Sequence, residues 1–241
     1  MAYTSYLDSR ISSFLRLLSE ETLTVLTQIV LDDEQICGVT DICSLSLLAM
    51  LTRVRQPSRF LQLGTHYGYT ALVLADIMKH NIHRGRLYTV ELRAECHVIA
   101  RAHAGRAGLG DSIEFIDGAS TDEHVIQMVR DNGPYDMIYI DSSHSYGETL
   151  KELEHYIENP AIVSDATLVF FHDASEFARQ YDATGEGGVR AALDEWHEKH
   201  RRDFRVHIFE PPSWPNACGF GMLSRKPAPL PPETPTPGAR E

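Results

Sequence analysis

The chain has 241 residues, 43% of them apolar, which is enough for one medium-sized domain with a full hydrophobic core. A net charge of −12 argues against a surface that follows nucleic-acid phosphates, so we expect no nucleic-acid partner. The four cysteines show no metal-ligand spacing, no signal peptide is recognisable, and the apolar runs are too short to span a bilayer. We therefore expect a cytoplasmic protein with reduced thiols and no membrane partner.

Apolar residues at helical spacing predict one or two helices over residues 9–30, with Ser19 as a cap. A further helix is predicted over residues 41–55, capped by Thr40 or Asp41 and ending before Pro57. Three roles stay open for these helices: covering a sheet edge, forming part of a substrate pocket, or forming the face of a homodimer.

A glycine-containing turn follows the first predicted strand, whose apolar residues are Phe60, Leu61 and Leu63. Gly64 lets the backbone leave the strand sharply, and Gly68 admits a ligand or a helix at close range before the helix over 69–79. Because His66 replaces the middle glycine of the dinucleotide fingerprint, the pattern argues against a pyrophosphate.

Glu91 ends the second predicted strand, residues 86–90, and stands 23 residues after Gly68. An acid at this place holds the two hydroxyls of a ribose in nucleotide-binding βαβ units. No phosphate-binding Gly-Lys-Ser/Thr motif occurs, so the expected ligand carries ribose and adenine without a phosphate chain.

The remaining elements alternate and therefore predict a doubly wound, mostly parallel α/β sheet. Helices are expected over 93–107, 121–131, 146–158 and 187–200, and strands over 112–116, 135–140 and 166–171. The last two strands, 204–209 and 218–223, are joined by a proline-rich loop and should pair antiparallel. The proline-rich tail over 226–241 cannot bury apolar area, and we expect it to be extended or disordered.

Several of these segments together resemble a known family. They are Leu-Gly-Thr-x-x-Gly-x-Thr at 63–70, Val-Glu at 90–91, Tyr-Asp-Met-Ile-Tyr-Ile-Asp-x-x-His-x-Tyr at 135–146 and Phe-His-Asp at 171–173. The chain is similar to class I S-adenosylmethionine-dependent methyltransferases. Within them it resembles the small-molecule O-methyltransferase branch, which is also similar to the cephalosporin-hydroxylase-like and macrolide-sugar methyltransferase group.

The resemblance covers residues 58–225 and implies a Rossmann-like seven-stranded sheet with an antiparallel last strand. It implies a cofactor-binding domain over 58–225 and S-adenosylmethionine as cofactor, while the helices predicted before it would form an N-terminal cap over 1–57. The residues expected to contact the cofactor are Gly64, Thr65, Gly68, Thr70, Glu91, Gly118, Ala119, Ser120 and Asp141. Gln62 stands where the family usually has an acid near the methionine end of the cofactor.

Functional side chains should converge at one edge of the sheet, because parallel strands all end there. In one hypothesis Asp141, His172 and Asp173 bind a divalent cation, Mg²⁺ in the first place, although histidine departs from the acid found in related metal-dependent enzymes. In the other, Asp141 accepts the cofactor's amino group, His144 or His172 is the general base, and Asp173 orients an imidazole.

Eight other histidines are predicted to lie on the surface, away from this edge, whereas His66 belongs to the cofactor turn. The eight are His80, His83, His97, His103, His124, His155, His197 and His200. The glycine-rich segment 176–189 is read either as a lid over the substrate or as a plain surface loop.

The sequence thus favours transfer of a methyl group to a small-molecule acceptor, at a hydroxyl oxygen, because a base or a metal at this edge matters most for a group that must lose a proton. An iron-dependent oxygenase with iron at Asp141, His172 and Asp173 is one alternative. A regulatory protein that binds the cofactor without turnover is the other.

Overall fold

A computed structural model describes residues 13–210 and 218–227. The strands are β1 Arg59–Leu63, β2 Arg86–Glu91, β3 Ile113–Asp117, β4 Tyr135–Ile140, β5 Val163–His172, β6 Phe204–Phe209 and β7 Phe220–Arg225. The helices are α1 Glu20–Val30, α2 Ile42–Arg55, α3 Tyr69–Lys79, α4 Ala94–Arg106, α5 Glu123–Asn132, α6 Tyr146–Glu152 and α7 Gly188–His200. Short helical turns are η2 Ser13–Leu17, η3 Gly110–Ser112, η4 Leu153–Ile157 and η5 Phe177–Tyr181. The start of the first predicted helix, the proline-rich loop and most of the predicted tail lie outside the described residues.

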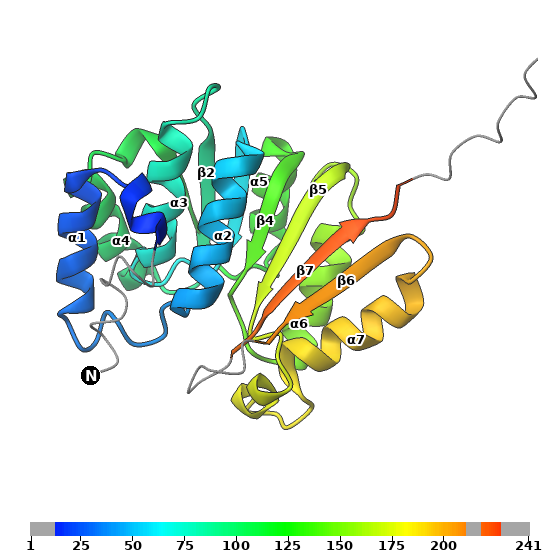
Figure 1. Cartoon of the computed structure of the whole chain (residues 1–241). Coiled ribbons are helices and arrows are strands. Elements are labelled where there is room, and N and C mark those ends of the chain that lie inside the picture. The colour runs from blue at the N-terminus through cyan, green and yellow to red at the C-terminus, as the bar shows by residue number, and fades with distance from the viewer. Residues whose placement is uncertain (1–12, 211–217, 228–241) are drawn as a thin grey trace, which may run out of the picture.

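The strands form one seven-stranded sheet in the order β3-β2-β1-β4-β5-β7-β6. Strand β7 runs antiparallel to both β5 and β6, and the other pairings are parallel. This confirms the predicted fold class, including the antiparallel last strand. Helices cover both faces, with α2, α3 and α4 on one side and α5, α6 and α7 on the other (Figure 1).

The helices before β1 belong to the same packed body as the sheet. The side chain of Ser19 caps α1, and that of Asp41 caps α2 by accepting the backbone N–H groups of Cys43 and Ser44. Both helices pack against α3, and their apolar faces join the core on that side of the sheet. The proposed division into a cap over 1–57 and a domain over 58–225 stays a prediction.

Strand β5 begins at Val163, three residues before the predicted start. Ser164, Asp165 and Ala166 are exposed, so no apolar alternation marks them as strand. The Thr167 hydroxyl donates to the backbone oxygen of Tyr135 at 2.6 Å and accepts the N–H of Ser164, and so bridges an irregularity in the pairing with β4. A side-chain hydrogen bond thus extends the strand where the sequence pattern gives no signal.

The strand order reverses at β1, because the chain moves outward through β2 and β3 and then returns to add β4 on the other side of β1. In open α/β sheets, ligands bind in the crevice at the carboxyl ends of the strands at such a reversal. Gly64 follows β1 and Asp141 follows β4, so both lie at this crevice.

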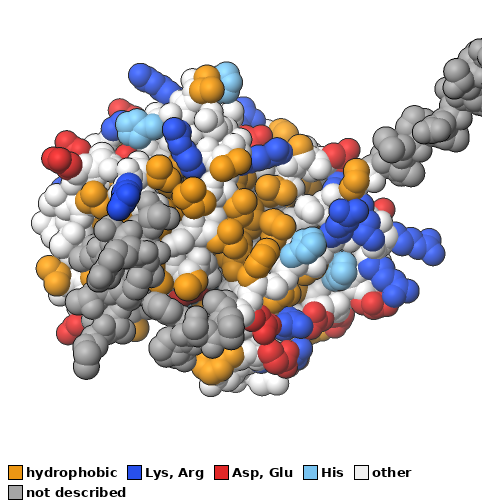
Figure 2. Space-filling model, viewed as in Figure 1, with side chains coloured by type: hydrophobic (Ala, Val, Ile, Leu, Met, Phe, Trp, Pro, Cys, Tyr) orange, Lys and Arg blue, Asp and Glu red, His pale blue; other side chains and the backbone are white. Residues whose placement is uncertain are grey.

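A patch of apolar side chains is visible on the face between α2 and the β7–β6 end of the sheet (Figure 2). It includes a hollow of about 440 Å³ lined by residues of α2, β6 and β7, among them Leu47, Phe209 and Phe220. The homodimer considered from the sequence stays a prediction. Within the described ranges, no helix is both long and apolar enough to cross a membrane.

Candidate functional site

The turn after β1 depends on two glycines in the left-handed region. Gly64 has φ +93°, and a Cβ on it would lie 2.0 Å from the backbone oxygen of Asp141. Gly68 has φ +92°, and a Cβ there would lie 3.1 Å from the Cβ of Ala100 on α4. Glycine at position 64 therefore lets the end of β1 approach the end of β4, and glycine at 68 lets two helices pack closely.

Glu91 holds this turn from the end of β2. Its Oε2 accepts the backbone N–H groups of Thr65 at 3.2 Å and His66 at 2.8 Å, and its Oε1 accepts the N–H of Arg93 at 3.0 Å. The side chain is nearly buried but borders a cavity. This carboxylate is thereby held rigidly where a ribose hydroxyl could donate to it, and the ribose role stays a prediction.

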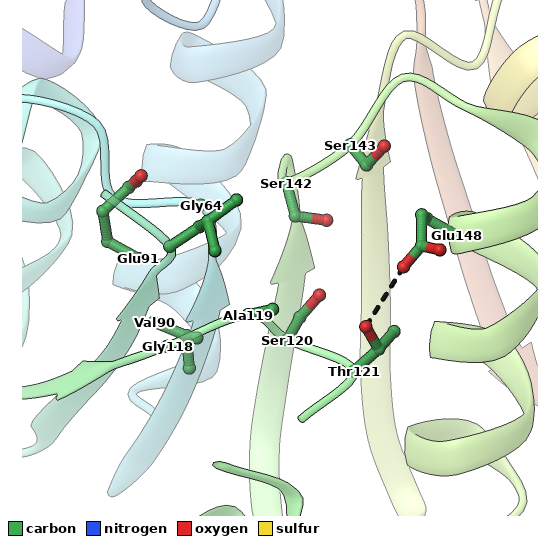
Figure 3. Close-up of a pocket in the computed structure, with 11 residues that line it drawn as sticks. Gly64, Val90, Glu91, Gly118, Ala119, Ser120, Thr121, Ser142, Ser143 and Glu148 are labelled. Carbon is green, nitrogen blue, oxygen red and sulfur yellow. Dashed lines mark hydrogen bonds between the residues drawn. The ribbon is translucent and has the colours of Figure 1, made fainter. Parts of the chain in front are cut away.

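That cavity has a volume of about 240 Å³ and lies between the ends of β1, β2, β3 and β4 (Figure 3). Five of the residues predicted to contact the cofactor line it: Gly64, Glu91, Gly118, Ala119 and Ser120. The cavity also has walls that the sequence reasoning did not predict, from Val90, Leu92, Thr121, Ser142, Ser143 and Glu148. Ser142 and Ser143 directly follow Asp141, so their position at a strand end is a signal that could have found them.

The other predicted cofactor contacts lie elsewhere around the turn. Thr65, Thr70 and Asp141 line a smaller adjoining cavity, which Gln62 also borders. Thr65 is buried and hydrogen-bonded to Thr89 at 2.6 Å, while the Nε2 of Gln62 donates to the oxygen of Gly64 at 2.7 Å. Both contacts fix the turn, and direct contact with a cofactor stays a prediction for these residues and for Gly68.

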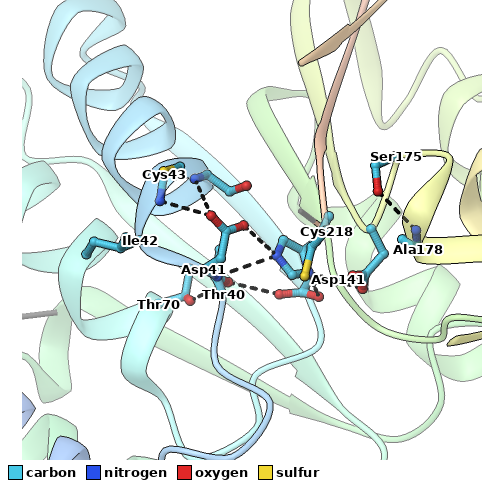
Figure 4. Close-up of polar contacts among 12 residues, drawn as sticks. Thr40, Asp41, Ile42, Cys43, Thr70, Asp141, Ser175, Ala178 and Cys218 are labelled. Carbon is cyan, nitrogen blue, oxygen red and sulfur yellow. Dashed lines mark hydrogen bonds and ion pairs between the residues drawn. The ribbon is translucent and has the colours of Figure 1, made fainter. Parts of the chain in front are cut away.

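His172 lies at the centre of a cluster of carboxylates beside this turn. Two of these carboxylates, Asp41 and Asp141, are labelled in Figure 4. Its Nε2 is 3.1 Å from the Oδ2 of Asp41. Its Nδ1 is 3.3 Å from the Oδ1 of Asp141 and 3.1 Å from the Oδ2 of Asp173. The structure thus brings together the three residues of the metal hypothesis, and it adds Asp41, which the sequence reasoning treated only as a helix cap.

The charges in this cluster favour a protonated ring at His172. Burial alone lowers the pKa of His172, but the carboxylates of Asp141 and Asp173 outweigh it and hold that pKa well above the ordinary value. Burial raises the pKa of Asp173, but His172 and His144 overcome this and leave that pKa well below its usual range. We infer an imidazolium surrounded by carboxylates at neutral pH.

His144 forms the outer part of the cluster. Its Nδ1 is 2.6 Å from the Oδ2 of Asp173, and about half of its side chain, 51%, is exposed. The hydrogen bond that His144 donates to Asp173 raises the pKa of His144, against the opposing effect of burial. Asp173 itself has φ +56°, a left-handed conformation rare for a non-glycine residue and typical of functional sites. His144 is therefore a basic imidazole with one nitrogen fixed and about half of its side chain open to solvent.

Two histidines predicted to lie on the surface are buried, so that prediction is wrong for them. His97 is 1% exposed, with its Nε2 3.0 Å from the hydroxyl of Thr65 and its Nδ1 paired with Asp117. His103 is 5% exposed and donates to the backbone oxygen of Tyr67 at 2.9 Å. Both rings fill the side of α4 that faces the turn after β1, and their polar atoms find partners there.

The segment predicted as a lid is tied down at its base. Asp182 accepts the backbone N–H groups of Thr184 at 2.9 Å and Gly188 at 2.9 Å, and so joins η5 to the start of α7. Burial raises the pKa of Asp182, but the hydrogen bond from the Thr184 hydroxyl and these backbone hydrogen bonds lower it to about 2. The lid and the plain-loop readings both stay open.

Residues 61–174 match the model of a family described as a methyltransferase domain. The chain is 33% identical over 96 residues to a catechol O-methyltransferase of Niastella koreensis, covering 39% of this chain and 42% of that one. It is 30% identical over 95 residues to a catechol O-methyltransferase of Mycobacterium tuberculosis, covering 39% and 40%. The chain thus spans about two fifths of the length of these relatives.

Solved structures share the fold over nearly the whole length. The O-methyltransferase of Bacillus cereus in complex with SAH has a TM-score of 0.72 at 19% identity, covering 91% of this chain and 97% of that one. The O-methyltransferase TomG of Streptomyces achromogenes, in complex with SAM, has a TM-score of 0.69 at 20% identity, covering 92% and 96%. At these identities the likeness concerns the fold.

Proposed function

The chain carries a class I methyltransferase domain, the S-adenosylmethionine-dependent type, and on this premise we propose that it methylates a hydroxyl oxygen of a small molecule. The observation that carries the proposal is the cavity at the strand-order reversal. Five residues expected to contact the cofactor from their sequence motifs line this one cavity, although they come from three different strand ends. The hydroxyl acceptor is the finer part of the proposal, and the catechol O-methyltransferases among the relatives support it.

Two features of the cavity support S-adenosylmethionine as its ligand. Glu91 offers a carboxylate at one end for the ribose, and small residues from Gly118 to Ser120 leave room for a flat base. When bound, the cofactor supplies an activated methyl group on a sulfonium, so the protein has to align the acceptor and handle its proton.

His144 is the general base in this proposal. Its Nδ1 is engaged by Asp173, which leaves the Nε2 side of the half-exposed ring as the place to accept the acceptor's proton. Asp173 holds the ring and stabilises the imidazolium that forms when the proton arrives. His172 is too buried to meet an acceptor directly and keeps Asp173 in place through its own ring.

Related metal-dependent enzymes imply Mg²⁺ at this crevice, and the residues fit that ion poorly. Asp141, His172 and Asp173 can each offer an atom within 4.8 Å of the others, and so can Asp41, His172 and Cys218. Both groups, however, include His172, whose two ring nitrogens already face carboxylates. The ring favours the doubly protonated form, which has no lone pair for a metal ion. Mg²⁺ prefers oxygen ligands in octahedral geometry. We propose that the His172 imidazolium provides the positive charge between Asp141 and Asp173 and that transfer needs no metal.

The proposal is tested by binding and by turnover. Titration calorimetry should show binding of S-adenosylmethionine by the wild type and weaker binding by Glu91→Ala, with NAD as the control ligand. Transfer of a radiolabelled methyl group should then be followed with phenolic and sugar hydroxyls as acceptors, with and without excess chelator, and the two rates should be equal. Binding without transfer to any acceptor would favour the non-catalytic alternative, and turnover that requires iron and oxygen would favour the oxygenase.

A further inference from the structure

Beneath the cavity lies a carboxyl group that neither the cofactor contacts nor the proposed base uses. Glu152, at the end of α6, has no exposed surface. Its Oε1 accepts hydrogen bonds from the hydroxyls of both Ser120 and Ser142, which line the cavity. Its Oε2 is buried and finds no hydrogen-bond partner within the part of the chain that the structure describes.

This arrangement fixes which way the two hydroxyl protons point. A serine hydroxyl has one proton to donate and two lone pairs. When both serines donate to Oε1, their oxygens can present only lone pairs to the cavity. Burial raises the pKa of Glu152 to about 7, yet a proton carried on Oε2 leaves Oε1 an acceptor. The two serines therefore face the cavity as acceptors in either protonation state.

A third hydroxyl on the same wall is set in the same way. The hydroxyl of Thr121 donates to the Oε2 of Glu148 at 3.1 Å (Figure 3). Ser120 is also held through its backbone, because its carbonyl oxygen accepts the hydroxyl of Tyr156. Three neighbouring hydroxyls on this wall thus have their protons directed at carboxyl groups, and the wall accepts hydrogen bonds without donating any from these side chains.

We propose that Glu152 is a positioning residue that makes this wall select a nucleobase carrying an exocyclic amine, which has two protons to donate and no lone pair free to accept. Adenine fits, and its 6-oxo counterpart, hypoxanthine, sets an oxygen against the serine lone pairs. The inference rests on the proposed function, because it needs the ribose at Glu91 and the base at Ser120 and Ser142. The new element is that Glu152, which does not line the cavity itself, determines which nucleobase the cavity prefers.

The test compares two ligands, S-adenosylhomocysteine and S-inosylhomocysteine, by calorimetry on the full chain. Loss of one or two hydrogen bonds with buried partners changes affinity about 10-fold to 100-fold, so the wild type should prefer the adenosyl ligand by that factor. Glu152→Leu frees both hydroxyls to turn and donate, and the preference should fall below about 3-fold. Glu152→Gln should keep it, because the amide oxygen can take the place of Oε1 while its NH₂ takes the place of Oε2.

A purely structural role for Glu152 would weaken both ligands alike and leave their ratio unchanged in Glu152→Leu, which would overturn the inference. Should that variant fail to fold, Ser120→Ala and Ser142→Ala each remove one acceptor and should lower the ratio by themselves. Equal affinity of the wild type for the two ligands would refute the inference and leave the proposed function standing. Failure of the wild type to bind S-adenosylhomocysteine at all would refute both.

Discussion

Replacing His172 by asparagine removes the positive charge that we infer between Asp41, Asp141 and Asp173. Removing one partner from a buried ion pair lowers the free energy of unfolding by about 3–5 kcal/mol. Because one of the carboxyl groups can take up a proton, we expect a loss near 3 kcal/mol, roughly the lower limit of that range. For a chain of this size, each kcal/mol shifts the melting temperature by about 2–4 °C. We therefore expect His172→Asn to melt about 6–12 °C below the wild type at neutral pH.

The assay is thermal unfolding with and without Mg²⁺, and His103→Asn is the matched control. His103 is equally buried, but its ring donates to a backbone oxygen, so this variant should lose only about 2–4 °C, the effect of one neutral hydrogen bond. Mg²⁺ should stabilise His172→Asn, by about 2.7 kcal/mol at a hundred times its dissociation constant, and leave the wild type unchanged. Stabilisation of the wild type by Mg²⁺, or a melting temperature of His172→Asn equal to that of the control, would refute the imidazolium.

The pH dependence of this stabilisation has a definite sign. The pKa of His172 is raised in the folded protein, so its contribution is complete below the unfolded value of about 6.5 and is lost as the pH rises through the folded pKa. The pKa of Asp173 is lowered, so its contribution is lost as the pH falls below about 4, the unfolded value. The difference in melting temperature between the wild type and His172→Asn should therefore be largest between these limits.

Three further outcomes are expected. His144→Ala should lower the rate of transfer about 10²-fold to 10⁴-fold. In the wild type, the acid limb of the pH–rate profile should lie above pH 6.5, because Asp173 raises the pKa of His144, and this limb should disappear in the variant. An unchanged limb in the variant would exclude His144 as the base. Gly64→Ala should abolish cofactor binding in calorimetry, since its Cβ would lie 2.0 Å from a backbone oxygen. The control Gly105→Ala should bind the cofactor normally, because its Cβ would meet open space. Gly105 lies within α4, so this variant should also be more stable than the wild type by about 0.5–1 kcal/mol. The pKa of Glu152, raised to about 7, weakens the folded wild type as the pH rises from about 4.5. The free energy of unfolding of Glu152→Gln, measured with denaturant, should therefore gain about 2.5 kcal/mol on that of the wild type between pH 5 and pH 8, and a constant difference would contradict the raised pKa.

Local patterns in the sequence were enough to predict the α/β fold. Each strand that ends at the site is a short apolar run beside a turn, and glycines at 64 and 68 mark the loop by their chemistry alone. Alternation of helices and strands implies a parallel sheet, because crossovers are right-handed and bring all strand ends to one edge. Five of the residues expected at the cofactor could be placed together for this reason.

The polar contacts around the site could not be predicted, because they join residues that are distant in sequence. Asp41 reads as a helix cap and fulfils that role, yet it also pairs with His172, 131 residues away. His97 reads as a surface residue of α4, and only packing against Thr65 and Asp117 buries it. Glu152 carries no signal beyond its helix, since burial and two serine partners from separate loops give it a role.

The chain order of apolar runs and glycines thus determined which strand ends meet, because secondary structure and crossover handedness follow from local sterics and hydrophobic periodicity. The tertiary structure alone decided the charge state of the cluster. Whether His172 is a metal ligand or a cation depends on two quantities, the number of carboxylates that face its two nitrogens and the burial of its ring. Neither quantity can be read from the residue itself or from its neighbours in sequence.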